Sequence, residues 1–388
     1  MAGIALSPWP DSWRVGACIL LTAAVVVVLL RQHPRWRSVA MACCVVAMGM
    51  MLGSRQQPTG EPDSQSSVST AASDSQSSVS TAALHVRQQL LEHYHEWGIS
   101  DQAYGVIAAM TLGDKTQIGR ELKDTYSKVG SAHILALSGL HMMIIYSVIT
   151  LFLGWRRIRM LSQVVVILAV WAFALLVGMS PSVVRSAFMI SIYGLLSLGY
   201  RERMSVNTLA FTAIVMLAID PASLYDIGFQ LSYMAVLCIL LFNPLFGRLL
   251  PLHVLQRHRW LAFLWGLTTV SLSAQIGTAP LIAYYFGRFS TWFLLSNYLV
   301  VPLATVILWL TLCVVATCWW AALQQLLAAL LSAVVVMMNQ LLEAISQWPY
   351  CSIEGLRPSW VQVALVYLVI GCCYVLLSLK VARARQSV

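Results

Sequence analysis

Charged residues are scarce in this chain. Of its 388 residues only 10% are Asp, Glu, Lys or Arg, whereas 59% are hydrophobic, and the mean hydropathy is +0.76. Soluble globular domains carry about 25% charged residues, so the composition excludes a soluble domain as the main part of the chain. The sequence predicts an integral membrane protein.

Several chemical motifs are also absent. No G-x-x-x-x-G-K-[ST] segment is present, so we do not expect the chain itself to bind the phosphates of ATP. The nine cysteines form no C-x-x-C pair, and all but Cys351 lie in predicted spans, so no disulfide framework is indicated. In HYHEW, His93 and His95 point to different faces of a helix and no further ligand cluster follows. We therefore predict no metal and no cofactor.

Long apolar runs are the main positive feature. About eleven segments are long and apolar enough to be membrane-spanning helices. They lie near residues 15–31, 38–53, 132–153, 160–178, 181–199, 205–219, 227–246, 260–284, 297–319, 323–346 and 359–380. The stretch 286–320 holds Asn297 and Pro302 within apolar sequence, and we expect a broken or re-entrant helix there. The predicted fold class is all-α, a polytopic transmembrane helical bundle.

Basic residues between the spans indicate the orientation, because Lys and Arg near span ends are retained in the cytoplasm. In an eleven-span arrangement the basic clusters all fall on one side, which accounts for most of the net charge of +9. The clusters are Arg31, Arg35 and Arg37; Arg156, Arg157 and Arg159; Arg201 and Arg203; Arg248, Arg257 and Arg259; and Lys380, Arg383 and Arg385. We therefore expect a multi-pass protein of the bacterial cytoplasmic (inner) membrane, with its N-terminus outside and its C-terminus in the cytoplasm.

The chain is expected to have five parts. They are an N-terminal transmembrane hairpin (1–54), a flexible Ser-rich linker (55–83), an outer amphipathic helical segment (84–131), the main membrane domain (132–380) and a basic cytoplasmic tail (381–388). No basic n-region precedes the first apolar run and a second span follows, so the run predicts an anchor and not a cleaved signal peptide. The linker holds the sequence DSQSSVSTAA twice, at 63–72 and 74–83, and buries too little apolar surface to order itself.

Four segments combine polar residues and glycine with apolar sequence. The first, MTLGDKTQIGRELKDTYSKVGSAHILALSGLHMMII, contains a Gly-Asp-Lys turn, an amphipathic helix and an apolar stretch with two histidines. The others are GMSPSVVRSAFMI at 178–190, DPASLYDIGFQLSYMAVL at 220–237, and SLSAQIGTAPLIAYYFGRFS at 271–290 with SNYLVVPL at 296–303. In these segments and their order the chain resembles the ComEC competence family, whose members carry DNA across the bacterial cytoplasmic membrane.

The resemblance implies a channel for uptake of single-stranded DNA during natural transformation. Family members usually carry a soluble oligonucleotide-binding-type domain after the first spans, and many end with a metallo-β-lactamase-like domain. Here the Ser-rich repeat stands where the oligonucleotide-binding-type domain usually lies, and no H-x-H-x-D-H sequence is present. We therefore expect that the chain carries out no metal-dependent hydrolysis and is not an enzyme. The implied partners are single-stranded DNA, the lipid bilayer, a periplasmic DNA-binding receptor and a cytoplasmic ATPase or helicase-like motor. An assembly of several copies stays open.

A path for a single strand through lipid needs polar groups for phosphates and aromatic faces for bases. Ser138 and Gly139 favour a helix break within a predicted span. His133 and His141 lie about 80° apart around a continuous helix, so both can border one lumen. The candidate lining residues are His133, Ser138, Gly139, His141, Arg185, Gln230, Ser232, Tyr233, Gln275, Thr278, Tyr284, Tyr285 and Asn297. Helix packing through small residues, with the histidines bonded to neighbouring helices, is the alternative.

Arg185 is the most specific of these candidates, because an unpaired guanidinium in an apolar span is costly. It lies four positions after Pro181, near the outer end of its predicted span. Two interpretations stay open. One is an outer contact to phosphate, which arginine can make with two hydrogen bonds. The other is a structural ion pair with Asp220 or Asp226.

Three other functions are considered. A secondary transporter of a small anionic solute would also use broken helices and a buried arginine, and a degenerate relative retained for another role would keep the same motifs. An intramembrane serine hydrolase using Ser138 and His141 is disfavoured. Residues three apart on one helix rarely come within hydrogen-bond reach unless a special turn joins them.

Overall fold

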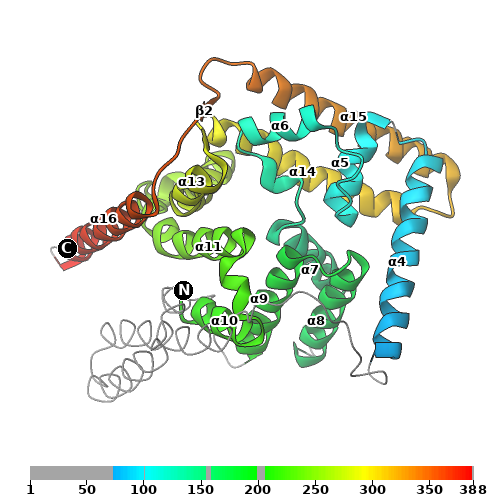
Figure 1. Cartoon of the computed structure of the whole chain (residues 1–388), viewed down its shortest axis with the longest axis horizontal. Coiled ribbons are helices and arrows are strands. Elements are labelled where there is room, and N and C mark those ends of the chain that lie inside the picture. The colour runs from blue at the N-terminus through cyan, green and yellow to red at the C-terminus, as the bar shows by residue number, and fades with distance from the viewer. Residues whose placement is uncertain (1–72, 100, 154–158, 199–205, 387–388) are drawn as a thin grey trace, which may run out of the picture. The chain divides into compact units, whose positions relative to one another are not determined.

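The computed structural model describes residues 73–99, 101–153, 159–198 and 206–386 (Figure 1). Helices dominate these ranges, and the strands within them are β1 (Arg288–Ser290) and β2 (Ser352–Glu354). The all-α prediction is therefore confirmed. The predicted spans at 15–31 and 38–53 and the first repeat copy at 63–72 lie outside the described residues.

The described residues divide into two compact units. Residues 206–233 belong to the small unit, and residues 74–198 and 234–386 belong to the large unit. In chain order the helices are α4 (Ser73–Glu96), α5 (Asp101–Leu112), α6 (Arg120–Lys128), η1 (Ala132–Ile134), α7 (Gly139–Leu153), α8 (Arg159–Leu176), α9 (Pro181–Leu198), α10 (Val206–Ile219), η2 (Pro221–Tyr225), α11 (Ile227–Phe246), α12 (Leu252–Arg257), α13 (Arg259–Phe286), α14 (Phe293–Ala316), α15 (Ala321–Ser346) and α16 (Trp360–Gln386).

Four of the described helices are long and apolar enough to cross a membrane. They are α11, α14, α15 and residues Trp360–Leu379 of α16. Shorter apolar helices occupy Ala103–Leu112, His141–Thr150, Ser162–Leu176 and Val206–Ile219. These helices indicate a membrane protein, whereas the predicted number of about eleven spans is not confirmed.

The broken or re-entrant helix predicted within 286–320 is wrong. After β1 a single helix, α14, runs from Phe293 to Ala316 and contains both Asn297 and Pro302. A proline removes only one amide donor from a helix, and neighbouring groups in a packed membrane protein satisfy the freed carbonyl. The chain instead reverses before α14, where Gly287 ends α13 with a φ of 66°.

The Ser-rich segment differs from our expectation in its last part. α4 begins at Ser73 and includes the whole second repeat copy, 74–83. Alanine is the best helix former, and adding residues to an existing helix is far easier than starting one. The copy therefore extends the helix that residues 84–96 already form, and the predicted flexible tether over 55–83 is helical from Ser73 onward.

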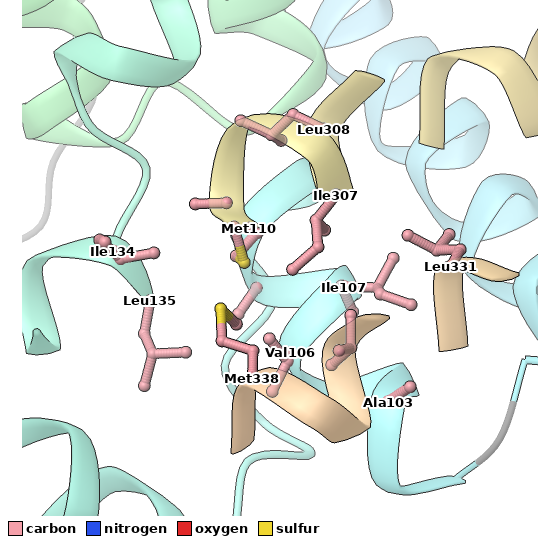
Figure 2. Packing of buried hydrophobic residues seen from close by; sticks show 14 of the residues in the cluster. Ala103, Val106, Ile107, Met110, Ile134, Leu135, Ile307, Leu308, Leu331 and Met338 are labelled. Atoms are coloured by element: carbon pink, nitrogen blue, oxygen red, sulfur yellow. The ribbon is translucent and has the colours of Figure 1, made fainter. Parts of the chain in front are cut away.

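The main core of the large unit lies between α5, α14 and α15 (Figure 2). α14 and α15 pack along each other, and α5 packs against both. α5 is too short to cross a bilayer, yet Val106, Ile107 and Met110 are all 0% exposed. They share one cluster with Ile307 of α14 and Met338 of α15. Burial of apolar surface therefore holds this short helix in place.

A second packed group in the large unit joins α7, α8 and α9. Met142 of α7, Val170 of α8 and Ala187 of α9 are each 0% exposed and belong to one cluster. Trp171 of α8 donates its indole N–H to the hydroxyl of Ser191 in α9 at 3.1 Å. This group fixes the start of α7, which carries the segment with two histidines.

Candidate functional site

The helix break that we predicted at Ser138 and Gly139 is present. The chain makes the short helix η1, continues without regular structure, and begins α7 at Gly139. Ser138 precedes the helix, and its carbonyl accepts a hydrogen bond from the amide of His141 at 3.1 Å. The first amides of α7 therefore have no carbonyl of a preceding helical turn to bond.

The side chain of His141 caps the start of α7. Its Nδ1 accepts a hydrogen bond from the backbone amide of Ser138 at 3.1 Å and lies 3.0 Å from the Ser138 hydroxyl oxygen. This resembles a capping box, in which the side chain at the third helical position accepts a hydrogen bond from the N-cap amide. The residue is 2% exposed, and its Nε2 has no hydrogen-bond partner within the part of the chain that the structure describes.

Ser138 and His141 thus come within hydrogen-bond reach, contrary to our expectation. The reason is the helix break, because Ser138 stands at the N-cap position and not inside the helix. The Nδ1 lone pair that would accept the hydroxyl proton also accepts the backbone amide. The contact therefore has the form of a helix cap.

His133 lies in η1 and is exposed. That His133 and His141 border one path stays a prediction.

Arg185 lies in α9, one turn after its first residue, and is 5% exposed. Burial removes the guanidinium from lipid, as expected for an arginine in an apolar helix. α9 follows a turn in which Met179 has a φ of 55°, a left-handed conformation that is uncommon for a residue with a side chain. The ion pair with Asp220 or Asp226 stays a prediction.

The two aspartates have local partners in the small unit. Asp220 accepts a hydrogen bond from the Ser223 hydroxyl at 2.7 Å and caps η2. Asp226 accepts hydrogen bonds from the amides of Gly228 and Phe229 at 3.3 and 3.0 Å, at the start of α11. Both carboxylates thus act as N-caps, a role that their side chains favour.

The remaining candidates of the small unit lie in the first turns of α11. Gln230 donates its amide to a backbone carbonyl of η2 at 2.8 Å, and the Ser232 hydroxyl donates to a carbonyl one turn earlier at 2.7 Å. Tyr233 is 4% exposed, and its hydroxyl lies 3.4 Å from that of Thr212 in α10. Such contacts are typical of residues that pack helices together, which is the alternative to lining a path for DNA.

Four candidates lie in the second half of α13: Gln275, Thr278, Tyr284 and Tyr285. The Thr278 hydroxyl donates to a carbonyl one turn earlier at 3.0 Å. Tyr284 and Tyr285 are exposed, and their ring centroids lie 5.0 Å apart. Asn297, in α14, has a buried Oδ1 without a partner among the described residues. That these residues line a path stays a prediction.

The close helix contact at Gly277 was not predicted from the sequence. A Cβ added there would lie 2.4 Å from the Met234 carbonyl oxygen and 2.9 Å from Cys238 Sγ, both in α11. The Gly277 carbonyl accepts the hydroxyl hydrogen of Tyr367 in α16 at 2.7 Å. Pro280 follows in the same helix. In the sequence, a glycine three residues before a proline within an apolar helix could have indicated such a close contact.

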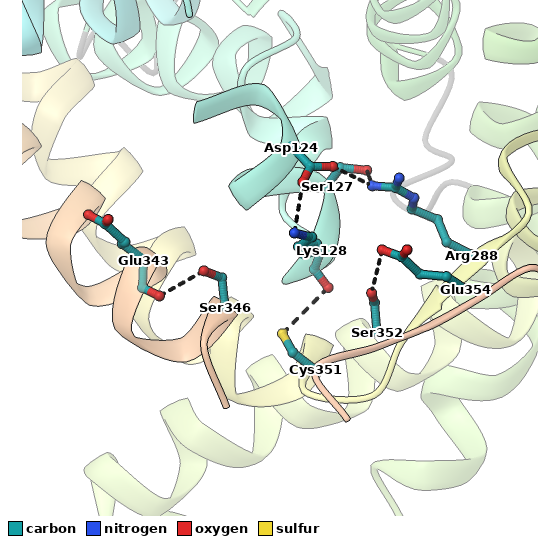
Figure 3. A network of polar contacts seen from close by, with 9 residues as sticks. All are labelled: Asp124, Ser127, Lys128, Arg288, Glu343, Ser346, Cys351, Ser352 and Glu354. Atoms are coloured by element: carbon teal, nitrogen blue, oxygen red, sulfur yellow. Dashed lines mark hydrogen bonds and ion pairs between the residues drawn. The ribbon is translucent and has the colours of Figure 1, made fainter. Parts of the chain in front are cut away.

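A polar network outside the long apolar helices was also missed (Figure 3). Arg288 of β1 donates to Asp124 at 2.9 Å and to the Ser127 hydroxyl at 3.2 Å, and Lys128 pairs with Asp124 at 2.9 Å. Hydrogen bonds from Lys128 and then Arg288 hold the pKa of Asp124 below its ordinary value. Because β1 pairs antiparallel with β2, this network fixes α6 to a two-stranded sheet.

A model of the Competence protein family matches residues 110–380, which is more than half of the chain. The chain belongs to the competence protein family. The match includes α7, α9, α11 and α13, which carry the motif residues described above. It confirms the resemblance to the ComEC competence family.

Three related proteins align with about half of this chain. "ComE operon protein 3" of Bacillus subtilis (strain 168) is 32% identical over 204 residues, which are 52% of this competence family chain and 25% of the relative. An uncharacterized protein of Aquifex aeolicus (strain VF5) is 30% identical over 206 residues, 52% of this chain and 45% of the relative. The uncharacterized protein YcaI of Escherichia coli (strain K12) is 25% identical over 210 residues, 52% and 27% of the two chains.

The alignments thus cover less than half of the length of each of these relatives. No solved structure matches the chain. The activity and partners of a full-length relative are therefore proposals for this competence family chain.

Proposed function

We propose that the chain forms the membrane core of a channel through which single-stranded DNA enters the cytoplasm during natural transformation. The observation that carries the proposal is the family match over 110–380. It runs through helices long and apolar enough for a membrane. Two buried polar residues on apolar helices, His141 and Arg185, support it, because such residues in membrane segments often mark the path of a polar substrate.

The proposed channel acts without catalysis and depends on partners. The sequence holds no loop for ATP phosphates, so a cytoplasmic ATPase or helicase-like motor would pull the strand. A periplasmic DNA-binding receptor would deliver it. We propose no metal and no cofactor for the chain itself.

The proposed orientation places the β1–β2 sheet outside the inner membrane. Basic residues precede α13 and end α16, at the helix ends remote from this sheet, which agrees with retention of positive charge in the cytoplasm. Exposed Trp292 and Trp348 flank the ends of α14 and α15 that are next to the strands in the chain, and exposed Trp319 and Trp320 flank the opposite ends. Tryptophan favours both membrane–water interfaces, so these pairs support spans by α14 and α15.

The test of the proposed function is a transformation assay in the natural host after deletion of the gene. Complementation with the chain should restore transformants and the delivery of labelled DNA to the cytoplasm. Undiminished uptake in the deletion strain would contradict the proposal.

Substitution of Arg185 separates a path residue from a scaffold residue. If Arg185 contacts phosphate, Arg185→Gln should abolish uptake while the protein accumulates normally, and Arg185→Lys should lower uptake because it keeps the charge but loses the two-bond geometry. If Arg185 only pairs with a carboxylate, Arg185→Gln should lower abundance, because a buried charge is left unpaired.

Double variants complete the Arg185 test. Abundance and uptake are measured together for Arg185→Gln with Asp220→Asn and for Arg185→Gln with Asp226→Asn. Restoration by either second substitution would refute the phosphate role. Stable but inactive protein in each background would support it.

One observation favours a hydrolase as a second candidate, the 3.0 Å distance between the Ser138 hydroxyl and His141 Nδ1. A fluorophosphonate probe should label Ser138 if that hydroxyl is a nucleophile. We expect no labelling, because Nδ1 also accepts the Ser138 amide. A transporter of small anions would be indicated instead if the purified chain bound an anionic metabolite and no oligonucleotide.

A further inference from the structure

The segment that joins α11 to α13 is basic and has no acidic residue near it in the chain. Its arginine and histidine side chains are Arg248, His253, Arg257, His258 and Arg259. All of them are exposed. The sequence has no Asp or Glu from residue 227 to residue 342, so no carboxylate close in the chain neutralises these groups. We call residues 248–260 the α12 surface.

The backbone holds the α12 surface in a compact, ordered turn. α12 packs against α13, and the amide of His258, between the two helices, donates to the Val254 carbonyl at 3.1 Å. His253, Gln256 and Arg257 are exposed at spacings of three and four residues, so they form one face of α12. The helix therefore presents a polar, cationic face outward.

The arginines of the α12 surface are not neutralised within the folded chain. Among the residues that the structure describes, no carboxylate forms an ion pair with Arg248, Arg257 or Arg259. Retention of arginine in the cytoplasm explains the sign of this charge, but it does not say what neutralises the charge in the folded protein. A guanidinium group can bind a phosphate with two parallel hydrogen bonds, so a phosphate-bearing partner fits these side chains.

Exposed apolar side chains adjoin the same surface. Trp260, Phe263 and Leu264 are 83%, 51% and 45% exposed, and their spacing places them on one face of α13 directly after Arg259. Leu249, which lies in a turn between α11 and α12, is 68% exposed. Acyl chains would cover such side chains favourably, because apolar area is then removed from water. The neighbouring arginines would then lie at the level of the lipid headgroups.

We propose that the α12 surface binds an anionic phospholipid, with its arginines donating to the phosphate oxygens and Trp260 beside the acyl chains. Clusters of basic residues next to a membrane helix attract anionic lipids, and α11, which leads into this segment, is long and apolar enough to cross a membrane. A nucleic-acid strand also carries phosphates, but it would leave the apolar face of α13 in water. The site does not rest on the proposed function, because the membrane itself supplies the ligand.

Two triple variants with the same change of charge test the site. The first replaces each arginine of the α12 surface by glutamine: Arg248→Gln, Arg257→Gln and Arg259→Gln. The matched control replaces three exposed cations in or just before α6 by glutamine: Lys115→Gln, Arg120→Gln and Lys123→Gln. Because both variants lose the same number of positive charges, a loss of binding confined to the first variant reports the α12 surface and not the net charge.

The experiment measures binding of fluorescent phosphatidylglycerol to the full chain in nonionic detergent. Phosphatidylcholine with the same acyl chains is the zwitterionic probe. We expect the arginine variant to bind phosphatidylglycerol about thirty- to a hundredfold more weakly, because each cation near an anionic lipid contributes about three- to fivefold. The control variant should match the unsubstituted chain, and phosphatidylcholine should bind weakly to all three proteins.

Three outcomes would overturn the proposal. The first is equal affinity of the folded arginine variant and the unsubstituted chain for phosphatidylglycerol. The second is an equal loss in the control variant, which would show that net charge alone acts. The third is binding of oligothymidylate that the arginine variant loses, together with no preference of the unsubstituted chain for phosphatidylglycerol over phosphatidylcholine. That result would assign the surface to nucleic acid.

A second measurement keeps every arginine, because their loss can disturb membrane insertion. In a cysteine-free background, Gln256→Cys carries a benzophenone maleimide on the exposed face of α12, next to Arg257. The chain is illuminated in nanodiscs that contain equal amounts of phosphatidylglycerol and phosphatidylcholine. We expect several times more adducts with phosphatidylglycerol. Equal amounts of the two adducts would refute the lipid site and would leave the proposed channel untouched.

Discussion

At the scale of single residues, Gly277 has the least room for a side chain among the positions described above. We expect Gly277→Ala to destabilise the chain by about 1–3 kcal/mol, because overpacking forces the backbone apart, and the nearest atom is the rigid Met234 carbonyl at 2.4 Å. Thermal unfolding of the detergent-solubilised chain measures the effect. Gly266→Ala is the control, since Gly266 lies in the same helix with nothing within 4 Å of an added Cβ. Equal unfolding temperatures for the two variants would contradict the close approach of α11 and α13.

At the scale of elements, α6 depends on its contacts with β1 and with α15. Tyr126, 0% exposed, donates its hydroxyl to Asn339 of α15 at 2.7 Å, and Arg288 and Lys128 hold Asp124. The folded pKa of Asp124 lies below the ordinary value of 3.8. The charged carboxylate therefore stabilises the fold above that value, and this contribution is lost as the pH falls through the folded pKa.

The corresponding experiment compares the stability of the unsubstituted chain and Asp124→Asn between pH 7 and pH 3. The difference should be largest at pH 7 and should decrease toward the acid end, as the pH falls below 3.8 and approaches the lowered folded pKa of Asp124. It should be small, because the side chain is 45% exposed and solvent screens such pairs to about 1 kcal/mol or less. A difference that does not change with pH would show that Asp124 acts through packing alone.

At the scale of the whole molecule, the proposed orientation can be tested with one cysteine on each side. In a cysteine-free background, Gln347→Cys after α15 should react with a membrane-impermeant maleimide in cells with an opened outer membrane. Gln256→Cys in α12 should react only after the inner membrane is opened as well. Both positions are exposed, so labelling reports sidedness and not burial. The reverse pattern would overturn the orientation.

Sequence patterns predicted the helices better than the contacts between them. The expected span at 227–246 coincides with α11, and the expected span at 359–380 lies within one residue of Trp360–Leu379, because apolar length is a local property of the sequence. The break at Ser138–Gly139 was also predictable from local preferences. The bond between Arg288 and Asp124 was not, since these residues are 164 positions apart and their approach depends on the packing of several helices.

The two copies of DSQSSVSTAA are identical, and only the second, 74–83, is part of the described helix α4. Loss of residues 63–73 would therefore leave the same ten residues directly before Leu84. The sequence of α4 from Asp74 onward would not change, and the apolar face around Tyr94, which is 2% exposed, would keep its register. An allele with one copy would thus encode the same docked helix as an allele with two.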